Sequence, residues 1–185
     1  MSLTEYKKTI KNPVRPRTVT FLTRDQEVLL VLKKRGFGKG NRLGVGGKIE
    51  EDKDERVKGE DLLTVAKKAA AREIFEEIDV IVAPEDLVLM ATLRFYFPHI
   101  ADESWNQEVF AFVANKWKGE PRAKKDEKGL IEVEPEWVNK SEIPFDRMWD
   151  DAHYWLPKIL TGKRLEGEFI FDENLRVTER LITYN

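Results

Sequence analysis

The chain has 185 residues and a formal net charge of −2, from 32 Lys and Arg against 34 Asp and Glu. Hydrophobic residues make up 41% and charged residues 36%, which is typical of a globular domain with a charged surface. The absence of cysteine excludes disulfides, thiolate zinc sites and a cysteine nucleophile.

No uncharged stretch approaches the roughly 20 apolar residues of a membrane helix. The opening MSLTEYKKTI lacks the apolar stretch of a secretion signal. The nearly balanced charge argues against a general nucleic-acid coat. We therefore expect a cytoplasmic protein that forms no stable complex with nucleic acid or a membrane, and a monomer, with a dimer as the alternative.

The first 17 residues carry five basic side chains against one acid and contain two prolines, which predicts a mobile basic arm rather than a packed element. Two β-rich runs follow at 18–23 and 27–33, and the polar residues between them predict a hairpin. Residues 34–48 contain six glycines, which excludes a regular helix or strand. We expect a long shaped loop there that brings backbone close to another group.

Residues 50–61 are mostly charged and predict an exposed insertion, with disorder as the alternative. A helix is expected at about 61–78, with Asp61 as its N-cap. The later elements are strands at 87–97, 107–114 and 131–138, a helix at about 150–160 and a C-terminal hairpin over 167–184. Because helices and strands do not alternate regularly, the pattern predicts an α+β fold with a mixed sheet between helices, formed by residues 18–185 as one domain.

The predicted helix at 61–78 carries Glu73, Glu76 and Glu77 within a sector of about 100°. Glu73 and Glu77 are like charges at positions i and i+4, which costs about 0.2–0.5 kcal/mol, and the C-terminal half of a helix disfavours anions further. This crowding predicts a compensating cation, and oxygen ligands suit Mg²⁺, with Mn²⁺ as the alternative. Glutamates on an isolated helix more often form an ordinary solvated face than a metal site. The neighbouring sequence therefore has to distinguish the two interpretations.

That context is Gly46–Gly47–Lys48, which ends the glycine-rich loop before the helix. Together they resemble the Nudix box, G-x5-E-x7-R-E-U-x-E-E-x-G-U, in which U is aliphatic. The matching residues are Gly47, Arg72, Glu73, Ile74, Glu76, Glu77 and Val80.

The chain departs from the box in two places. Gly47 and Arg72 are 25 positions apart where the box has 14, so eleven residues are added, and they coincide with the charged stretch. Counting back from Arg72, Thr64 stands where the first box glutamate would fall, and Asp79 replaces the late glycine. One of three acids, Glu50, Glu51 or Glu60, is expected to replace that glutamate in space.

The resemblance extends to KKRGFGKG (33–40), PFDRMWDDAHYWLP (144–157) and GEFIFDENLRVTERLITY (167–184), which are similar to MutT-like Nudix hydrolases of oxidised purine nucleoside triphosphates such as 8-oxo-dGTP. It implies an α/β/α sandwich and Mg²⁺-dependent cleavage of a nucleoside triphosphate to the monophosphate and pyrophosphate. The alternatives are the same chemistry on a dinucleotide, a nucleotide sugar or ADP-ribose, and a nucleotide sensor without activity. The displaced box glutamate favours the sensor, whereas the retained acid trio argues against it.

The resemblance also implies roles for individual residues. Glu73, Glu76 and Glu77 would hold the metal ions together with the Gly46 carbonyl, Arg72 would orient these carboxylates, and Glu132 would lie near the metals and accept a proton. Trp149 would stack on the base and Asp151 would hydrogen-bond its edge. The remaining substrate-binding positions are Thr18, Lys33, Phe37, Leu43, Gly47 and Lys48.

Leu43 and Ala152 stand where the similar enzymes have an Asn and an Asp that read the base. Two hydrogen-bonding side chains are therefore missing, and an apolar wall discriminates by only about 1–3 kcal/mol per group. The sequence therefore predicts triphosphate hydrolysis more firmly than a preference for 8-oxoguanine.

Overall fold

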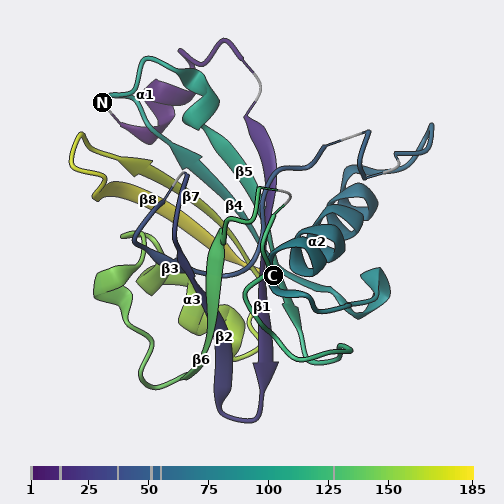
Figure 1. Ribbon diagram of the computed structural model, residues 1–185. Helices are drawn as coiled ribbons and strands as arrows, with labels where there is room; N and C mark the ends of the chain where they lie inside the picture. Colours follow the sequence, from purple (N-terminus) through teal and green to yellow (C-terminus); the bar gives the residue numbers. More distant parts are fainter. Residues whose placement is uncertain (1, 13, 37, 51, 55, 127) are drawn as a thin grey trace.

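A mixed sheet forms the centre of the computed structural model, which describes residues 2–12, 14–36, 38–50, 52–54, 56–126 and 128–185. Helix α2 (Leu62–Ile78) covers one face and α3 (Ala152–Leu160) the other (Figure 1). The strands are β1 (Arg15–Arg24), β2 (Glu27–Lys33), β3 (Arg42–Leu43), β4 (Val88–Tyr96), β5 (Gln107–Ala114), β6 (Val133–Asn139), β7 (Leu165–Phe171) and β8 (Val177–Tyr184). Short 3₁₀ turns lie at Pro84–Asp86, Glu103–Trp105 and Phe145–Arg147. The predicted mixed sheet between helices is confirmed.

The strand order is β3-β2-β1-β5-β4-β7-β8, and β6 pairs with β2. Strands β1 and β2 form the predicted hairpin, but they pair only beside its turn, at Thr23–Val28 and Arg24–Glu27. Beyond the turn β1 pairs in parallel with β5, while β2 pairs with β3 and β6. The other edge of β1 is therefore open to the glycine-rich loop, which pairs with it at Thr20–Val45 and Arg17–Lys48.

Strand β2 illustrates how the core is divided between the two faces. Its side chains alternate with the period of two that a strand imposes. Val28 and Leu30 pack in the cluster on the α3 side, whereas Leu29 and Val31 pack in the cluster on the α2 side. All four are buried, because helices cover both faces.

The N-terminal residues differ from the predicted basic arm. They form a short helix, α1 (Leu3–Lys7), capped by a reciprocal Ser2–Glu5 capping box, and β1 begins at Arg15. Leu3 and Tyr6 are buried in a small apolar cluster with residues of β4 and β7. Leu3 and Tyr6 therefore belong to a packed element, which the sequence did not predict, because two apolar side chains three positions apart share one helical face and bury together.

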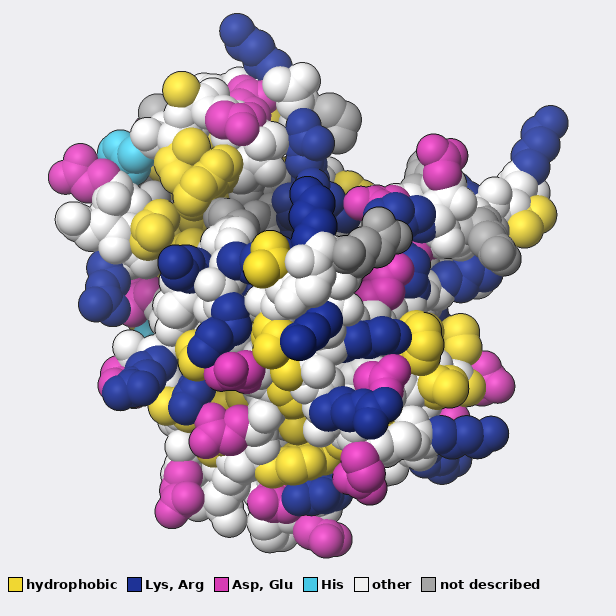
Figure 2. Space-filling view, viewed as in Figure 1, with side chains coloured by type: hydrophobic (Ala, Val, Ile, Leu, Met, Phe, Trp, Pro, Cys, Tyr) yellow, Lys and Arg dark blue, Asp and Glu magenta, His cyan; other side chains and the backbone are white. Residues whose placement is uncertain are grey.

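Strand β3 lies inside the stretch 34–48 that was expected to be a loop without regular strand, and its two residues pair with β2. The other main elements lie where the sequence placed them, within two or three residues at their ends. On the face shown in Figure 2, basic and acidic side chains are interspersed, in keeping with the near-neutral net charge. Within the described part of the chain, every helix is too short or too polar to cross a membrane.

Candidate active site

The predicted acidic helix is α2, and its two ends are set by aspartates. The Asp61 carboxylate accepts a hydrogen bond from the Thr64 N–H at 2.9 Å, which confirms the predicted N-cap. At the other end Asp79 adopts the left-handed conformation with φ of 58°, and its N–H bonds the Phe75 carbonyl. Glycine usually takes this capping position, and aspartate is among the few other residues that tolerate it. Although Asp79 replaces the box glycine, α2 therefore still ends in the left-handed cap that a glycine would form.

The three glutamates of α2 occupy different environments. The Glu77 side chain is 6% exposed and Glu73 is 15% exposed, whereas Glu76 is 51% exposed. Burial raises the pKa of Glu77 to about 7 against the pull of Lys33, and burial also raises the pKa of Glu73 against the pull of Arg72. The negative charges of Glu77 and Glu73 are therefore the unfavourable ones in this group, because both side chains are largely buried, whereas Glu76 is half exposed to solvent.

Arg72 organises two of these acids. Its Nη1 donates to Glu73 at 2.9 Å and to Glu76 at 3.0 Å, and its Nη2 donates to the Lys48 carbonyl at 3.0 Å. The other side of the guanidinium bonds Asp54, with Nε to Oδ1 at 2.7 Å and Nη2 to Oδ2 at 3.4 Å. Arg72 therefore joins the helix acids to both the glycine-rich loop and the charged stretch.

Asp54 pairs with Arg72, whereas Glu50 and Glu60, two of the acids expected to replace the first box glutamate, do not. Glu50 pairs with Lys53 and Glu60 pairs with Lys68, so neither holds Arg72. Glu51 lies outside the described residues. Thr64 serves the N-cap instead.

The sequence did contain a signal for Asp54. Counting forward from Gly47 by the box spacing arrives at Lys53, the residue beside Asp54, whereas counting back from Arg72 crosses the insertion. The stretch was also expected to be exposed, and most of its described residues are, but the Asp54 side chain is buried beneath Arg72.

Lys33 brings Glu132 to the acidic helix. The Lys33 ammonium lies 2.6 Å from Glu132 Oε1 and 3.4 Å from Glu77 Oε1. Glu77 also accepts a bond of 3.4 Å from the Gly46 N–H. The structure therefore places Lys33, Gly46, Glu77 and Glu132 together, and Gly46 contacts Glu77 through its N–H rather than through the carbonyl that was expected to hold a metal.

The glycine-rich loop lies against the backbone of β1 at Gly46 and against the Glu73 carboxylate of α2 at Gly47. A Cβ at Gly47 would lie 2.6 Å from the Glu73 carboxylate, and one at Gly46 would lie 2.1 Å from the Thr18 carbonyl oxygen. The Gly47 carbonyl accepts a bond from the Thr18 N–H at 2.9 Å, which fixes the loop on β1. The prediction that this loop exists for a close backbone approach is confirmed.

The donor set suits a hard divalent cation, because every candidate ligand is an oxygen and two of the carboxylates are buried among like charges. In the described residues no group of three or more acidic or histidine side chains is already spaced to hold a metal ion. Arg72 and Lys33 instead hold the carboxylates. A metal ion that binds these carboxylates would therefore have to displace Arg72 and Lys33 from them.

A second group of predicted residues gathers near the start of α3. Trp149 packs edge-to-face on Phe97 and Phe171, and a Cβ at Gly38 would lie 3.3 Å from Trp149 Nε1. Trp149 thus borders the glycine-rich loop. Phe37, which precedes Gly38, lies outside the described residues.

Asp151 is buried, and burial raises its pKa to about 6. Its carboxylate accepts a hydrogen bond of 2.7 Å from Trp155 Nε1. Leu43 packs against the cluster on the α2 side, whereas Trp149 packs against the cluster on the α3 side. The roles of Asp151 and Leu43 toward a base stay predictions.

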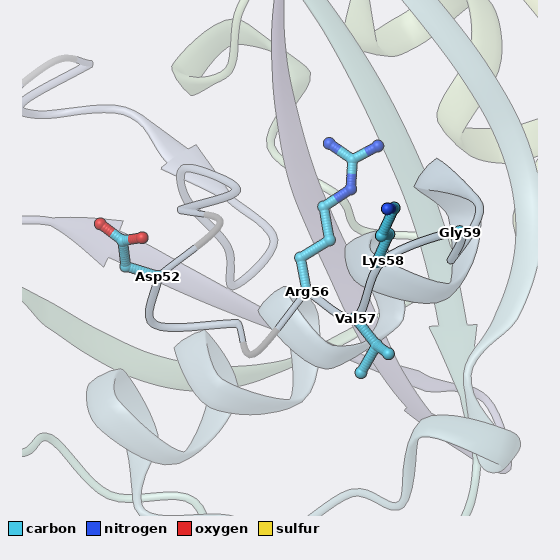
Figure 3. A pocket seen from close by; sticks show the side chains of 5 residues that line it. All are labelled: Asp52, Arg56, Val57, Lys58 and Gly59. Carbon is cyan, nitrogen blue, oxygen red and sulfur yellow. The ribbon is translucent and has the colours of Figure 1, made fainter.

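The charged stretch also borders a hollow of about 430 Å³ (Figure 3). Its lining residues are Asp52, Arg56, Val57, Lys58 and Gly59. None of them is a predicted site residue, so the volume of this hollow says nothing about the acidic site.

Comparison with known proteins gives the family. The NUDIX domain matches residues 13–159. The chain is 34% identical over 154 residues to a Danio rerio protein named oxidized purine nucleoside triphosphate hydrolase, and the match covers 83% of this chain and 85% of that protein. A Mus musculus protein of the same name is 32% identical over 159 residues, covering 84% and 86%.

The fold is similar to the crystal structure of a mutator MutT protein from Bacillus halodurans, with a TM-score of 0.67. The two chains are 23% identical, and the match covers 91% of this chain and 97% of that one. The box residues on α2, the fold and these matches agree, and the protein is a member of the Nudix hydrolase family.

Proposed function

We propose that this protein is an Mg²⁺-dependent hydrolase that cleaves purine nucleoside triphosphates, oxidised ones included, to the nucleoside monophosphate and pyrophosphate. The observation that carries the proposal is the Arg72 network, which gathers Glu73 and Glu76 beside the close approach of Gly47. The names of the relatives from Danio rerio and Mus musculus favour oxidised purines as substrates.

Each site residue has a part in this reaction. Glu73, Glu76 and Glu77 would hold a divalent cation, which would neutralise charge on the phosphates and lower the pKa of a bound water. Glu132 accepts the proton of the attacking water, because it is held by Lys33 at 2.6 Å while its side chain stays 45% exposed. Trp149 offers a stacking surface for the base, and Asp151 hydrogen-bonds its edge.

The experiment is a product assay with Mg²⁺ and a panel of 8-oxo-dGTP, dGTP, ADP-ribose and a dinucleoside polyphosphate. We expect the monophosphate and pyrophosphate, without inorganic phosphate, from the triphosphates. Turnover of ADP-ribose alone would redirect the proposal to another diphosphate. Tight nucleotide binding without any turnover would identify a sensor.

Two variants connect the activity to α2. Glu77→Gln and Glu76→Gln should each lower turnover by orders of magnitude, while Glu120→Gln, at an exposed glutamate outside the site, should not change it. Unchanged turnover in both α2 variants would refute the metal assignment. We place the activity in the cytoplasm and expect the monomer to be active.

A further inference from the structure

One basic side chain beside the acidic site has an unused hydrogen-bond donor. The Nε of Arg17, on β1, is buried and has no hydrogen-bond partner among the described residues. The other partly buried arginines near the sheet have carboxylate partners: Arg42 with Glu136, Arg72 with Asp54 and Arg94 with Glu108. A buried donor without an acceptor is costly, at about 1–3 kcal/mol, so Arg17 calls for an explanation.

The backbone places Arg17 next to the box. Arg17 pairs across an isolated bridge with Lys48, and the following residue, Thr18, donates its N–H to the Gly47 carbonyl at 2.9 Å. Gly47 in turn lies against the Glu73 carboxylate. Arg17 therefore pairs directly with the loop that touches the acidic helix. The charges of Arg17 and Glu73 attract each other, so Glu73 favours the charged form of Arg17.

Among the described residues, Arg72 and Lys33, the two cations that contact the glutamates of α2, already have partners. Arg72 bonds three carboxylates and a carbonyl, and Lys33 bridges Glu77 and Glu132. Around Arg17 the charges are Arg15 on its own strand, Lys48 on the loop and Glu73 on α2. Burial and the nearby Arg15 lower the pKa of Arg17, and Glu73 opposes them only in part.

We propose that Arg17 binds a phosphate group of the substrate's polyphosphate chain. This rests on the proposed triphosphate hydrolysis. A phosphate supplies the missing acceptor, and a guanidinium stays charged and offers several N–H groups to phosphate oxygens at once. Such a contact also offsets the repulsion between a polyphosphate and the glutamates of α2.

Calorimetric titration of the Mg²⁺-loaded protein with inorganic tripolyphosphate tests the inference without a base or turnover. We expect Arg17→Met to weaken tripolyphosphate binding about tenfold to hundredfold, the range for a hydrogen bond to a charged group. Arg17→Lys keeps the charge but loses Nε, so its binding should be intermediate. Arg15→Met, at the exposed arginine two residues away, is the matched control and should change binding less than threefold.

Titration with the nucleoside 8-oxo-2′-deoxyguanosine separates phosphate recognition from packing, because it lacks phosphate. Its affinity should be equal in the wild type and Arg17→Met, and thermal denaturation should confirm that the variant is folded. Equal tripolyphosphate affinity in wild type and Arg17→Met, parallel loss of nucleoside affinity, or no tripolyphosphate binding by the wild type would each overturn the inference. If the wild type binds tripolyphosphate through Arg17 but hydrolyses no nucleotide, the proposed function fails while the phosphate contact stands.

Discussion

The Asp54 carboxylate, shielded from solvent, accepts a hydrogen bond of 2.7 Å from Arg72 Nε, and the same guanidinium holds Glu73 and Glu76. An acid from an inserted stretch thus sets the position of two predicted metal ligands on a helix.

Replacing Asp54 tests this relationship. Asp54→Asn leaves the shape but removes the charge opposite Arg72, and breaking one partner of a buried pair costs about 3–5 kcal/mol. We expect a loss near the lower end of that range in urea denaturation and a turnover reduced at least tenfold. Asp52→Asn, at the exposed aspartate two residues away, is the control. Equal stability and turnover in Asp54→Asn would show that Arg72 is positioned without it.

Lys33 should compete with the metal ion. Its ammonium contacts both Glu77 and Glu132, and a unit charge at about 4 Å contributes up to about 4 kcal/mol at an effective dielectric constant of 20. Lys33→Met should therefore tighten Mn²⁺ binding at least tenfold, as followed by electron paramagnetic resonance. Lys34→Met removes an exposed pair with Glu134 and should leave the Mn²⁺ affinity unchanged. Weaker or equal Mn²⁺ binding in Lys33→Met would contradict the competition.

Trp149 should contribute to binding rather than to chemistry. Stacking of a base on an aromatic side chain is worth about 1–3 kcal/mol, so Trp149→Ala should raise the dissociation constant for the nucleoside monophosphate roughly tenfold to hundredfold. Trp149→Phe retains an aromatic face and should recover most of the affinity. Fluorescence or calorimetric titration measures both, and an unaltered affinity in Trp149→Ala would remove this residue from the site.

The buried Asp151 should make stability depend on pH. Because burial raises its pKa to about 6, the folded protein binds more protons than the unfolded chain between about pH 4 and pH 6. The contribution of Asp151 to the free energy of unfolding therefore falls as the pH rises through this window, by at most about 3 kcal/mol. Urea denaturation of the wild type and Asp151→Asn at several pH values measures the difference.

The neighbouring Asp150 provides a control of opposite sign. Although burial opposes it, the Val177 N–H and Arg176 together hold the pKa of Asp150 below its usual value. Its stabilising contribution is therefore present at neutral pH and is lost as the pH falls through the folded-state pKa. If Asp150→Asn and Asp151→Asn changed the pH dependence in the same direction, burial would not be the cause assigned here.

The sequence predicted best those elements whose local pattern agrees with their packing. Strand β2 reads as an apolar run because both of its faces are covered, and α2 combines a cap at Asp61 with an apolar stripe. Asp79 stands where the Nudix box has a glycine, which is a mismatch in the sequence. The position requires a left-handed backbone conformation, which aspartate also adopts.

The features that sequence reasoning missed depend on contacts between distant segments. The buried position of Asp54 depends on Arg72, eighteen residues further along the chain. Lys33 and Glu132 are 99 residues apart and meet because β2 and β6 are adjacent strands. At the N-terminus the prediction followed the basic composition and overlooked a capping box and two apolar residues. Those two residues are buried only because β4 and β7 lie beside them in the fold.

The eleven added residues are secured at both sides of their exposed middle. Asp54 ties the first part to Arg72, while Glu60 pairs with Lys68 and Asp61 starts α2. Arg56 to Gly59, between these ties, is exposed. Foreign sequence inserted at Lys58 would extend outward without displacing α2. This segment is therefore a place to insert a reporter domain near the proposed active site.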